Sequence, residues 1–173
     1  AATRKIPGFL PSANVTAIAY DPLTGNLIGL DQTFGMGMAF LLSIDPCDAL
    51  MTATLTSPTF MGMPVNSIEG FTVDPQNGDI FITFDTNNMP SFSGTLGKVD
   101  RMTGAVTVVG NMNSPSGDVD VLTFINTSLF GNDTEGNANP FHSFLYSIAH
   151  TANPITTTVL GNMRSPSQVF AMT

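Results

Sequence analysis

Short runs of apolar and β-branched residues recur along the chain, and each run is bounded by glycine, proline, asparagine or aspartate. Runs of about four to eight residues with this composition and these borders are typical of β-strands. No longer window carries an apolar stripe with the 3.6-residue period of a helix, so we expect almost no helix. The pattern predicts strands at residues 15–20, 26–31, 39–45, 49–56, 67–73, 79–85, 94–100, 105–110, 118–125, 127–131, 142–149 and 155–161.

Two motifs repeat along the chain at a spacing of 51 to 53 residues. The segment from Asn111 to Ser116 returns, nearly unchanged, between Asn162 and Ser167. The turn Asp21-Pro22-Leu23-Thr24-Gly25 returns as Asp74-Pro75-Gln76-Asn77-Gly78, and a third copy is replaced by Ile125-Asn126-Thr127-Ser128. In such turns aspartate accepts a backbone N–H two residues on, proline fixes φ, and glycine adopts positive φ. The chain therefore divides into three units of four strands each.

Several of the predicted strands are apolar on both faces, as in Ala39-Phe40-Leu41-Leu42 and Ile80-Phe81-Ile82. Sheets covered on both faces produce such runs, and each blade of a β-propeller is covered by its two neighbours. We therefore expect an all-β fold of three four-stranded antiparallel blades of β-propeller type, with a β-sandwich as the alternative. The prediction is a single repeat domain, 1–173, with blades at about 14–57, 66–112 and 117–163 and an extra C-terminal strand at 167–173.

The repeated units resemble the four-stranded blades of secreted β-propellers of the YVTN and NHL-like groups. The first half of a typical unit is matched by the segment from Glu69 to Phe81, with its Asp-Pro-x-x-Gly turn. The second half is matched by the segment from Lys98 to Gly110, which contains a second glycine turn. The resemblance covers almost the whole chain and implies a propeller fold. It implies little about function, because propellers serve as enzymes, lectins and scaffolds.

Charged residues are scarce in this chain of 173 residues, at 10% of the total. Five Lys and Arg face thirteen Asp and Glu, which gives a net charge of -8. Phosphate contacts require cations, so this balance argues against nucleic acid and against anionic membrane surfaces as partners. No apolar run approaches the roughly 18 residues of a membrane span.

The sequence favours an extracellular protein. The chain begins Ala1-Ala2-Thr3, which is typical of a mature end left by processing, and its polar residues are mostly Thr, Ser and Asn. The single cysteine, Cys47, excludes a disulfide within the chain. Three segments match the glycan acceptor pattern, which makes glycosylation candidates of Asn14, Asn126 and Asn132.

Three blades leave an open edge at each end, and open sheet edges invite pairing with another chain. The residues after the third unit read as the first strand of a further unit, which could be donated to a neighbouring copy. We therefore expect a homo-oligomer that assembles into filaments or a closed six-bladed dimer. The alternative is that this strand pairs with the N-terminal segment of its own chain. The candidate interface residues are Val169, Phe170, Met172, Phe9, Leu10, Met36, Met38, Phe60, Met61 and Met63.

Carboxylates provide the best case for a chemical site. Glu69 and Asp120 stand at corresponding positions of their units, and Asp118 is close by in sequence. The Glu-Gly start at Glu69 resembles the strand that carries a calcium-ligating Glu in some propeller hydrolases and lactonases. Convergence of Glu69, Asp118 and Asp120 on one calcium ion is the candidate metal site, since calcium takes six to eight oxygens. Solvated carboxylates without a cofactor are the default expectation.

No catalytic residue is predicted, because neither a Gly-x-Ser-x-Gly nor a phosphate-binding glycine motif is present. The leading hypothesis is therefore a secreted structural and interaction protein, not an enzyme, that binds copies of itself through blade edges. The second hypothesis is a module that binds a glycan or protein ligand. The third is a calcium-dependent hydrolase of lactonase type.

Overall fold

The computed structural model describes residues 15–33, 38–47, 51–65, 67–85, 94–112, 119–135 and 142–164. These residues form strands and turns. Within these ranges, no helix is long and apolar enough to cross a membrane. The strands are β1 (Val15–Tyr20), β2 (Leu27–Thr33), β3 (Met38–Ile44), β4 (Met51–Thr56), β5 (Thr59–Phe60), β6 (Met63–Pro64), β7 (Ile68–Val73), β8 (Ile80–Phe84), β9 (Thr95–Val99), β10 (Val106–Asn111), β11 (Val121–Ile125), β12 (Ser128–Glu135), β13 (His142–Ala149) and β14 (Thr156–Arg164).

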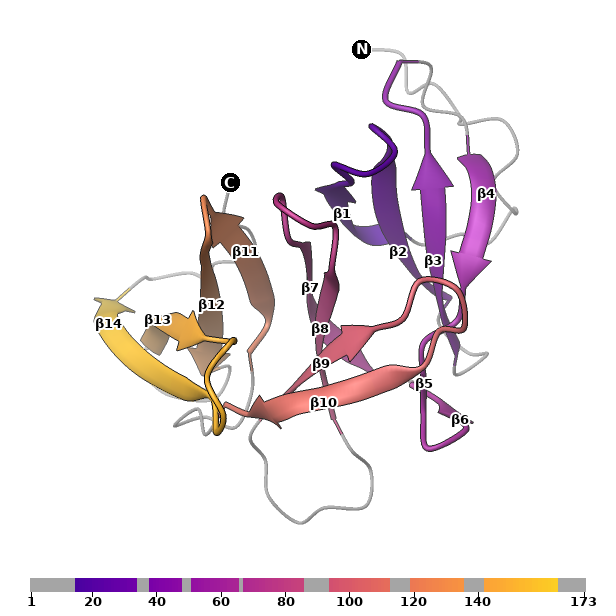
Figure 1. The fold of residues 1–173 in the computed structure, drawn as a ribbon. Coiled ribbons are helices and arrows are strands. Elements are labelled where there is room, and N and C mark those ends of the chain that lie inside the picture. Colours follow the sequence, from indigo (N-terminus) through magenta and orange to yellow (C-terminus); the bar gives the residue numbers. More distant parts are fainter. Residues whose placement is uncertain are drawn as a thin grey trace.

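Consecutive strands pair antiparallel into four-stranded sheets. The first sheet is β1–β4, the second is β7–β10 and the third is β11–β14. Their first strands stand side by side, with β7 between β1 and β11, while the last strands β4, β10 and β14 lie at the periphery (Figure 1). Blade-like sheets that radiate from adjacent inner strands are the propeller arrangement. The predicted all-β fold with four-stranded antiparallel blades is confirmed.

The predicted strands match the observed ones closely, with three main differences. β11 begins at Val121, although the predicted strand begins at residue 118. β12 and β14 are longer than predicted, because β13 pairs with β12 from His142 to Ile148 and with β14 from His142 to Ala149. The segment from Phe60 to Met63 was expected to lie between strands, but it is the turn of a small hairpin, β5–β6. Met61 and Gly62 adopt positive φ there, at 52° and 78°, as a two-residue hairpin turn requires.

The repeated Asp-Pro-x-x-Gly motif folds into the same turn in the first and second sheets. Oδ1 of Asp21 accepts the N–H of Leu23 at 3.1 Å, and Oδ1 of Asp74 accepts the N–H of Gln76 at 2.8 Å. Gly25 and Gly78 close the two turns with φ of 77° and 74°, which a side chain would strain. The motif therefore sets the length of the turn and the register of the strands that follow it.

The second sheet is buried on both faces because it lies between the other two. All five residues of β8 are buried. Ile80, Ile82 and Phe84 belong to the core shared with the first sheet, whereas Phe81 belongs to the core shared with the third. Each fully buried side chain of this size stabilises the fold by about 1.5–3 kcal/mol. This burial explains the apolar run Ile80-Phe81-Ile82 in the sequence.

An ion pair joins the first and second sheets at their turns. Nη1 and Nη2 of Arg101, in the β9–β10 turn, donate to the two carboxylate oxygens of Asp21 at 2.8 and 2.9 Å. Nε of Arg101 also donates to the carbonyl of Gly78 at 2.9 Å. The Asp21 side chain is 2% exposed and the Arg101 side chain 24%. The pair is therefore bidentate, largely buried and shared between two sheets.

Replacement of Arg101 by alanine is expected to lower the free energy of unfolding by about 2–3 kcal/mol, because it leaves the Asp21 carboxylate buried without its cation. Lys98→Ala is the matched control, since the Lys98–Asp79 pair is exposed at 46% and 31%. That control should change the free energy by less than about 0.5 kcal/mol. Urea unfolding measures both variants. Equal effects would contradict the conclusion that this ion pair stabilises the joint, by which we mean the interface between one sheet and the next.

Acid should weaken the same joint. Burial alone would raise the pKa of Asp21, but hydrogen bonds from Arg101, Thr24 and Leu23 and the Arg101 charge hold it below its ordinary value of 3.8. A lowered pKa means that the stabilisation is present above about pH 3.8 and is lost as the pH falls through the folded-state value. Urea unfolding below pH 4 should therefore show a steeper loss for the wild type than for Asp21→Asn. Equal losses would exclude the ion pair as a source of acid sensitivity.

Candidate functional site

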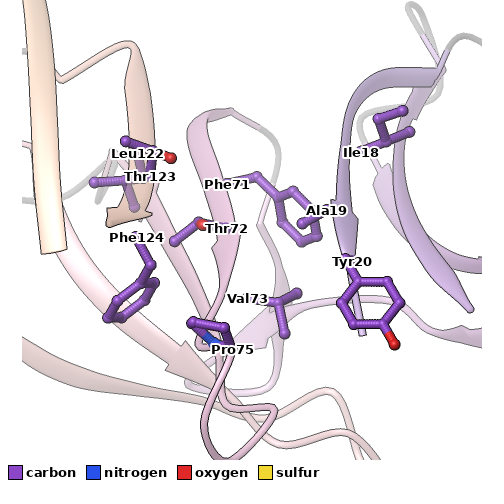
Figure 2. Close-up of a pocket in the computed structure, with 10 residues that line it drawn as sticks. All are labelled: Ile18, Ala19, Tyr20, Phe71, Thr72, Val73, Pro75, Leu122, Thr123 and Phe124. Carbon is purple, nitrogen blue, oxygen red and sulfur yellow. The ribbon is translucent and has the colours of Figure 1, made fainter. Parts of the chain in front are cut away.

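The inner strands β1, β7 and β11 border a shallow pocket of about 260 Å³ (Figure 2). Its lining is uncharged and combines aromatic rings, aliphatic side chains and threonine hydroxyls. The lining residues are Ile18, Ala19, Tyr20, Phe71, Thr72, Val73, Pro75, Leu122, Thr123 and Phe124. A pocket of this kind can accept a small neutral group, but it holds no charged side chain for acid–base chemistry.

The strand register shows which lining residues occupy equivalent positions. Tyr20 pairs with Leu27, Val73 pairs with Ile80, and Phe124 pairs with Leu129. One more step towards the turn, the N–H groups of Asp21 and Asp74 donate to the carbonyls of Asn26 and Asp79, at the place where Ile125 pairs with Ser128 in the third sheet. Tyr20, Val73 and Phe124 are therefore equivalent in the three sheets.

Two residues earlier in each inner strand stand Ile18, Phe71 and Leu122, which form a second equivalent set. Side chains two apart on a strand point to the same face. The two sets therefore share one face of each inner strand.

Equivalent side chains differ sharply in exposure. Phe71 and Leu122 are 6% and 4% exposed, because each packs into the core shared with the preceding sheet. Ile18 is 60% exposed and Tyr20 is 57% exposed, because no described residue lies against them in the place of a preceding sheet. We call this surface the first-sheet end face and define it by Ile18 and Tyr20.

The third sheet presents a second exposed surface on its opposite side. Phe130 follows Leu129 on β12, and Leu129 is buried in the core shared with the second sheet, so Phe130 points to the other face. Phe130 is half-buried, and Ile125 at the end of β11 is 56% exposed. We call this surface the third-sheet end face and define it by Ile125 and Phe130.

The predicted metal ligands are only partly described. Glu69 lies in β7 and Asp120 immediately precedes β11, and both are half-buried at equivalent positions of neighbouring inner strands. Asp118 lies outside the described residues. Among the residues that the structure describes, no group of three or more His, Cys, Asp or Glu is placed to hold a metal ion. The calcium site therefore stays a prediction.

The glycosylation candidates have different surroundings. Asn126 is exposed in the β11–β12 turn, with φ of 56°. Asn132 is fully buried in β12, and its Nδ2 donates to the carbonyl of Phe144 at 3.2 Å. The folded chain therefore presents Asn126 but not Asn132 to solvent, and Asn14 lies outside the described residues.

The predicted interface residues also divide into two groups. Met61 and Met63 project from the β5–β6 hairpin and are 83% and 55% exposed. Phe60 is half-buried instead, because its ring packs edge-on against Phe84 with centroids 5.5 Å apart, and Met38 is half-buried in β3. The remaining candidates lie outside the described residues, namely Phe9, Leu10, Met36, Val169, Phe170 and Met172.

The residues of the two end faces were not among the predicted interface residues. Alignment of the repeated turns could have found one of them, since it places Tyr20 opposite Val73 in the sequence. Phe130 gave no such signal, because the third unit replaces the turn motif by which the other two are aligned.

Comparison with known proteins adds little to this picture. No family model and no curated protein sequence matches the chain. Among solved structures, the one described as "Structure of Dos1 propeller" is similar, with 11% sequence identity and a TM-score of 0.42. The match covers 88% of this chain and 47% of that one, so the chain spans about half the length of the propeller that it resembles.

The joint between the second and third sheets should tolerate no added side chain at Gly70. The Thr83 hydroxyl there accepts the N–H of Gly70 and donates to the carbonyl of Val119 at 2.7 Å. A Cβ on Gly70 would lie 2.6 Å from that hydroxyl and 2.9 Å from the Leu122 side chain. Gly70→Ala should therefore lower the free energy of unfolding by about 1–3 kcal/mol.

The control for this substitution is Gly161→Ala in β14, where nothing lies within 4 Å of the added Cβ. It should change the unfolding free energy by no more than about 0.5 kcal/mol. Thermal and urea unfolding measure both variants. A Gly70→Ala variant as stable as the control would contradict the tight packing of this joint.

Proposed function

We propose that this protein is an extracellular structural and interaction protein that works by binding copies of itself through its end faces. The proposal rests on the exposure of Ile18 and Tyr20, at positions whose equivalents in the other two sheets face a neighbouring sheet. Apolar side chains in such a position gain free energy when a partner covers them, by up to about 1.5–3 kcal/mol for each large side chain. Ile18 and Tyr20 lie two residues apart on one face of β1, so one partner would cover both side chains together.

The low charge of the chain favours the same function. Only 10% of its residues are charged, so two copies can meet with little desolvation of ions. The four residues that define the end faces, Ile18, Tyr20, Ile125 and Phe130, are uncharged, so their contact would desolvate no ion of their own.

The C-terminal segment is the second element of the proposal. The sequence register of Val169, Phe170 and Met172 predicts the first strand of a further unit. Donation of this strand to a neighbouring copy would satisfy backbone groups at an open edge. Two copies could then close a ring, and a geometry that does not close would extend into a filament.

A second candidate function is supported by the pocket between the inner strands. Tyr20 and Phe124, which are exposed and half-buried, supply rings on which a sugar or an apolar side chain of a ligand could pack. The protein would then be a glycan- or protein-binding module. Binding to a glycan array by the chain that lacks residues 167–173, which keeps every residue of the pocket lining, would favour this candidate.

Self-association can be tested by the mass of the particle in solution. Light scattering coupled to size exclusion should give at least twice the 18.2 kDa of one chain at micromolar concentration. Replacement of both Ile18 and Tyr20 by asparagine should shift the mass towards that of a single chain. The matched control replaces Met102 and Val108 by asparagine, since these side chains are 89% and 44% exposed but lie outside both end faces and outside the predicted interface residues.

The control should keep the wild-type mass, and circular dichroism should show that both variants retain their sheets. If both pairs of substitutions lowered the mass equally, general hydrophobicity and not the end face would drive association. A wild-type particle with the mass of one chain would refute the proposed function.

Strand donation is tested separately by deletion of residues 167–173. The shortened chain should associate at least about tenfold more weakly, because it lacks the donated backbone hydrogen bonds. An unchanged mass distribution would exclude donation of this strand and leave the end faces as the sole contact.

A further inference from the structure

We infer that two copies associate head to tail, so that the first-sheet end face of one copy packs on the third-sheet end face of the other. This inference rests on the proposed self-association and specifies the partner of each face. Both joints inside the chain already have this polarity, because the second sheet presents one face to the first sheet and the opposite face to the third. The new joint would repeat the internal ones.

The side chains that meet at each internal joint indicate which faces match. Leu27, Ile80 and Leu129 are equivalent, because they pair with equivalent residues of the inner strands. The residues that follow them in the sequence are therefore also equivalent, namely Ile28, Phe81 and Phe130.

Ile28 and Val73 belong to the core between the first and second sheets, where both partners are aliphatic. Phe81 meets Phe124 between the second and third sheets, with ring centroids 5.8 Å apart, where both partners are aromatic.

The two end faces offer the corresponding pair for a third joint. Phe130 is equivalent to Phe81, and Tyr20 is equivalent to Phe124. Both are aromatic, and both are incompletely buried in the single chain. A head-to-tail contact would place Phe130 of one copy against Tyr20 of the other, in the arrangement that Phe81 and Phe124 already adopt. Aromatic pairs of this kind contribute beyond the area that they bury.

The charges of the turn residues provide an independent argument for the same pairing of the two end faces. Asp21 receives Arg101 from the next sheet at the first joint. The residue of the third sheet equivalent to Asp21 is Ile125, which follows Phe124 as Asp21 follows Tyr20. A head-to-tail partner therefore needs no cation at this position.

The residue equivalent to Arg101 in the first sheet is Pro46. Asp45 follows β3 and accepts the N–H of Cys47 at 2.7 Å, just as Asp100 follows β9 and accepts the N–H of Met102 at 2.9 Å. Pro46 therefore occupies the place of Arg101. The ion pair of the internal joint is replaced on both end faces by neutral residues, so neither face would bury an unpaired charge against the other.

The turn positions allow a test by exchange of charge. Ile125→Asp alone should weaken self-association at least about tenfold, because the carboxylate would be buried opposite Pro46. Pro46→Arg alone should weaken it similarly. An equimolar mixture of the two single variants should recover wild-type association as a 1:1 complex. In that complex one joint carries an aspartate–arginine pair and the other carries the original neutral pair.

The control is each single variant mixed with wild-type chain, which should form less complex than the two variants mixed together. Native mass spectrometry distinguishes the species, and recovery in the mixture shows that both variants are folded. Loss of association in the single variants without recovery in the mixture would overturn the head-to-tail contact. Unchanged association of both single variants would also overturn it, while the wild-type dimer would still support self-association. A monomeric wild type would remove both proposals.

Discussion

The structure depends on the packing of four-stranded sheets against each other face to face. A sheet that is covered on both sides needs buried residues in both alternating sets, and β8 meets this requirement with four apolar residues and the buried Thr83. Buried polar groups need hydrogen-bond partners, and this requirement fixes how the sheets align. The Arg101–Asp21 pair aligns the first and second sheets, and the Thr83 hydroxyl aligns the second and third. The requirement for face-to-face packing also acts at the ends of the series, where Ile18 and Tyr20 occupy positions that a neighbour normally covers.

Much of this fold could be predicted because its determinants are local. The turns at Asp21 and Asp74 contain their own hydrogen-bond acceptor and their own glycine, so the sequence alone indicates where adjacent strands pair. The hairpin around Met61 was missed, because a methionine with positive φ gives no recognisable turn signal. The partner of Arg101 was also missed, since it lies 80 residues away in the sequence and only the packing of two sheets brings it close.

The candidate site was predicted less well than the fold, for a related reason. Exposed methionines at Met61 and Met63 could be expected from their glycine-containing segment, and they are exposed. The end faces are different, because Tyr20 and Val73 have the same role in the repeat and differ only in what lies against them. Exposure of that kind is a property of the assembled sheets, and no local pattern encodes it.

The most direct test of the account is the solvent accessibility of Tyr20 in the native particle. Hydroxyl-radical labelling at micromolar concentration should modify Tyr20 slowly and Met61 quickly, and dilution below the dissociation constant should accelerate the labelling of Tyr20 alone. Rapid labelling of Tyr20 at every concentration would show that no partner covers the first-sheet end face, which would contradict self-association through it.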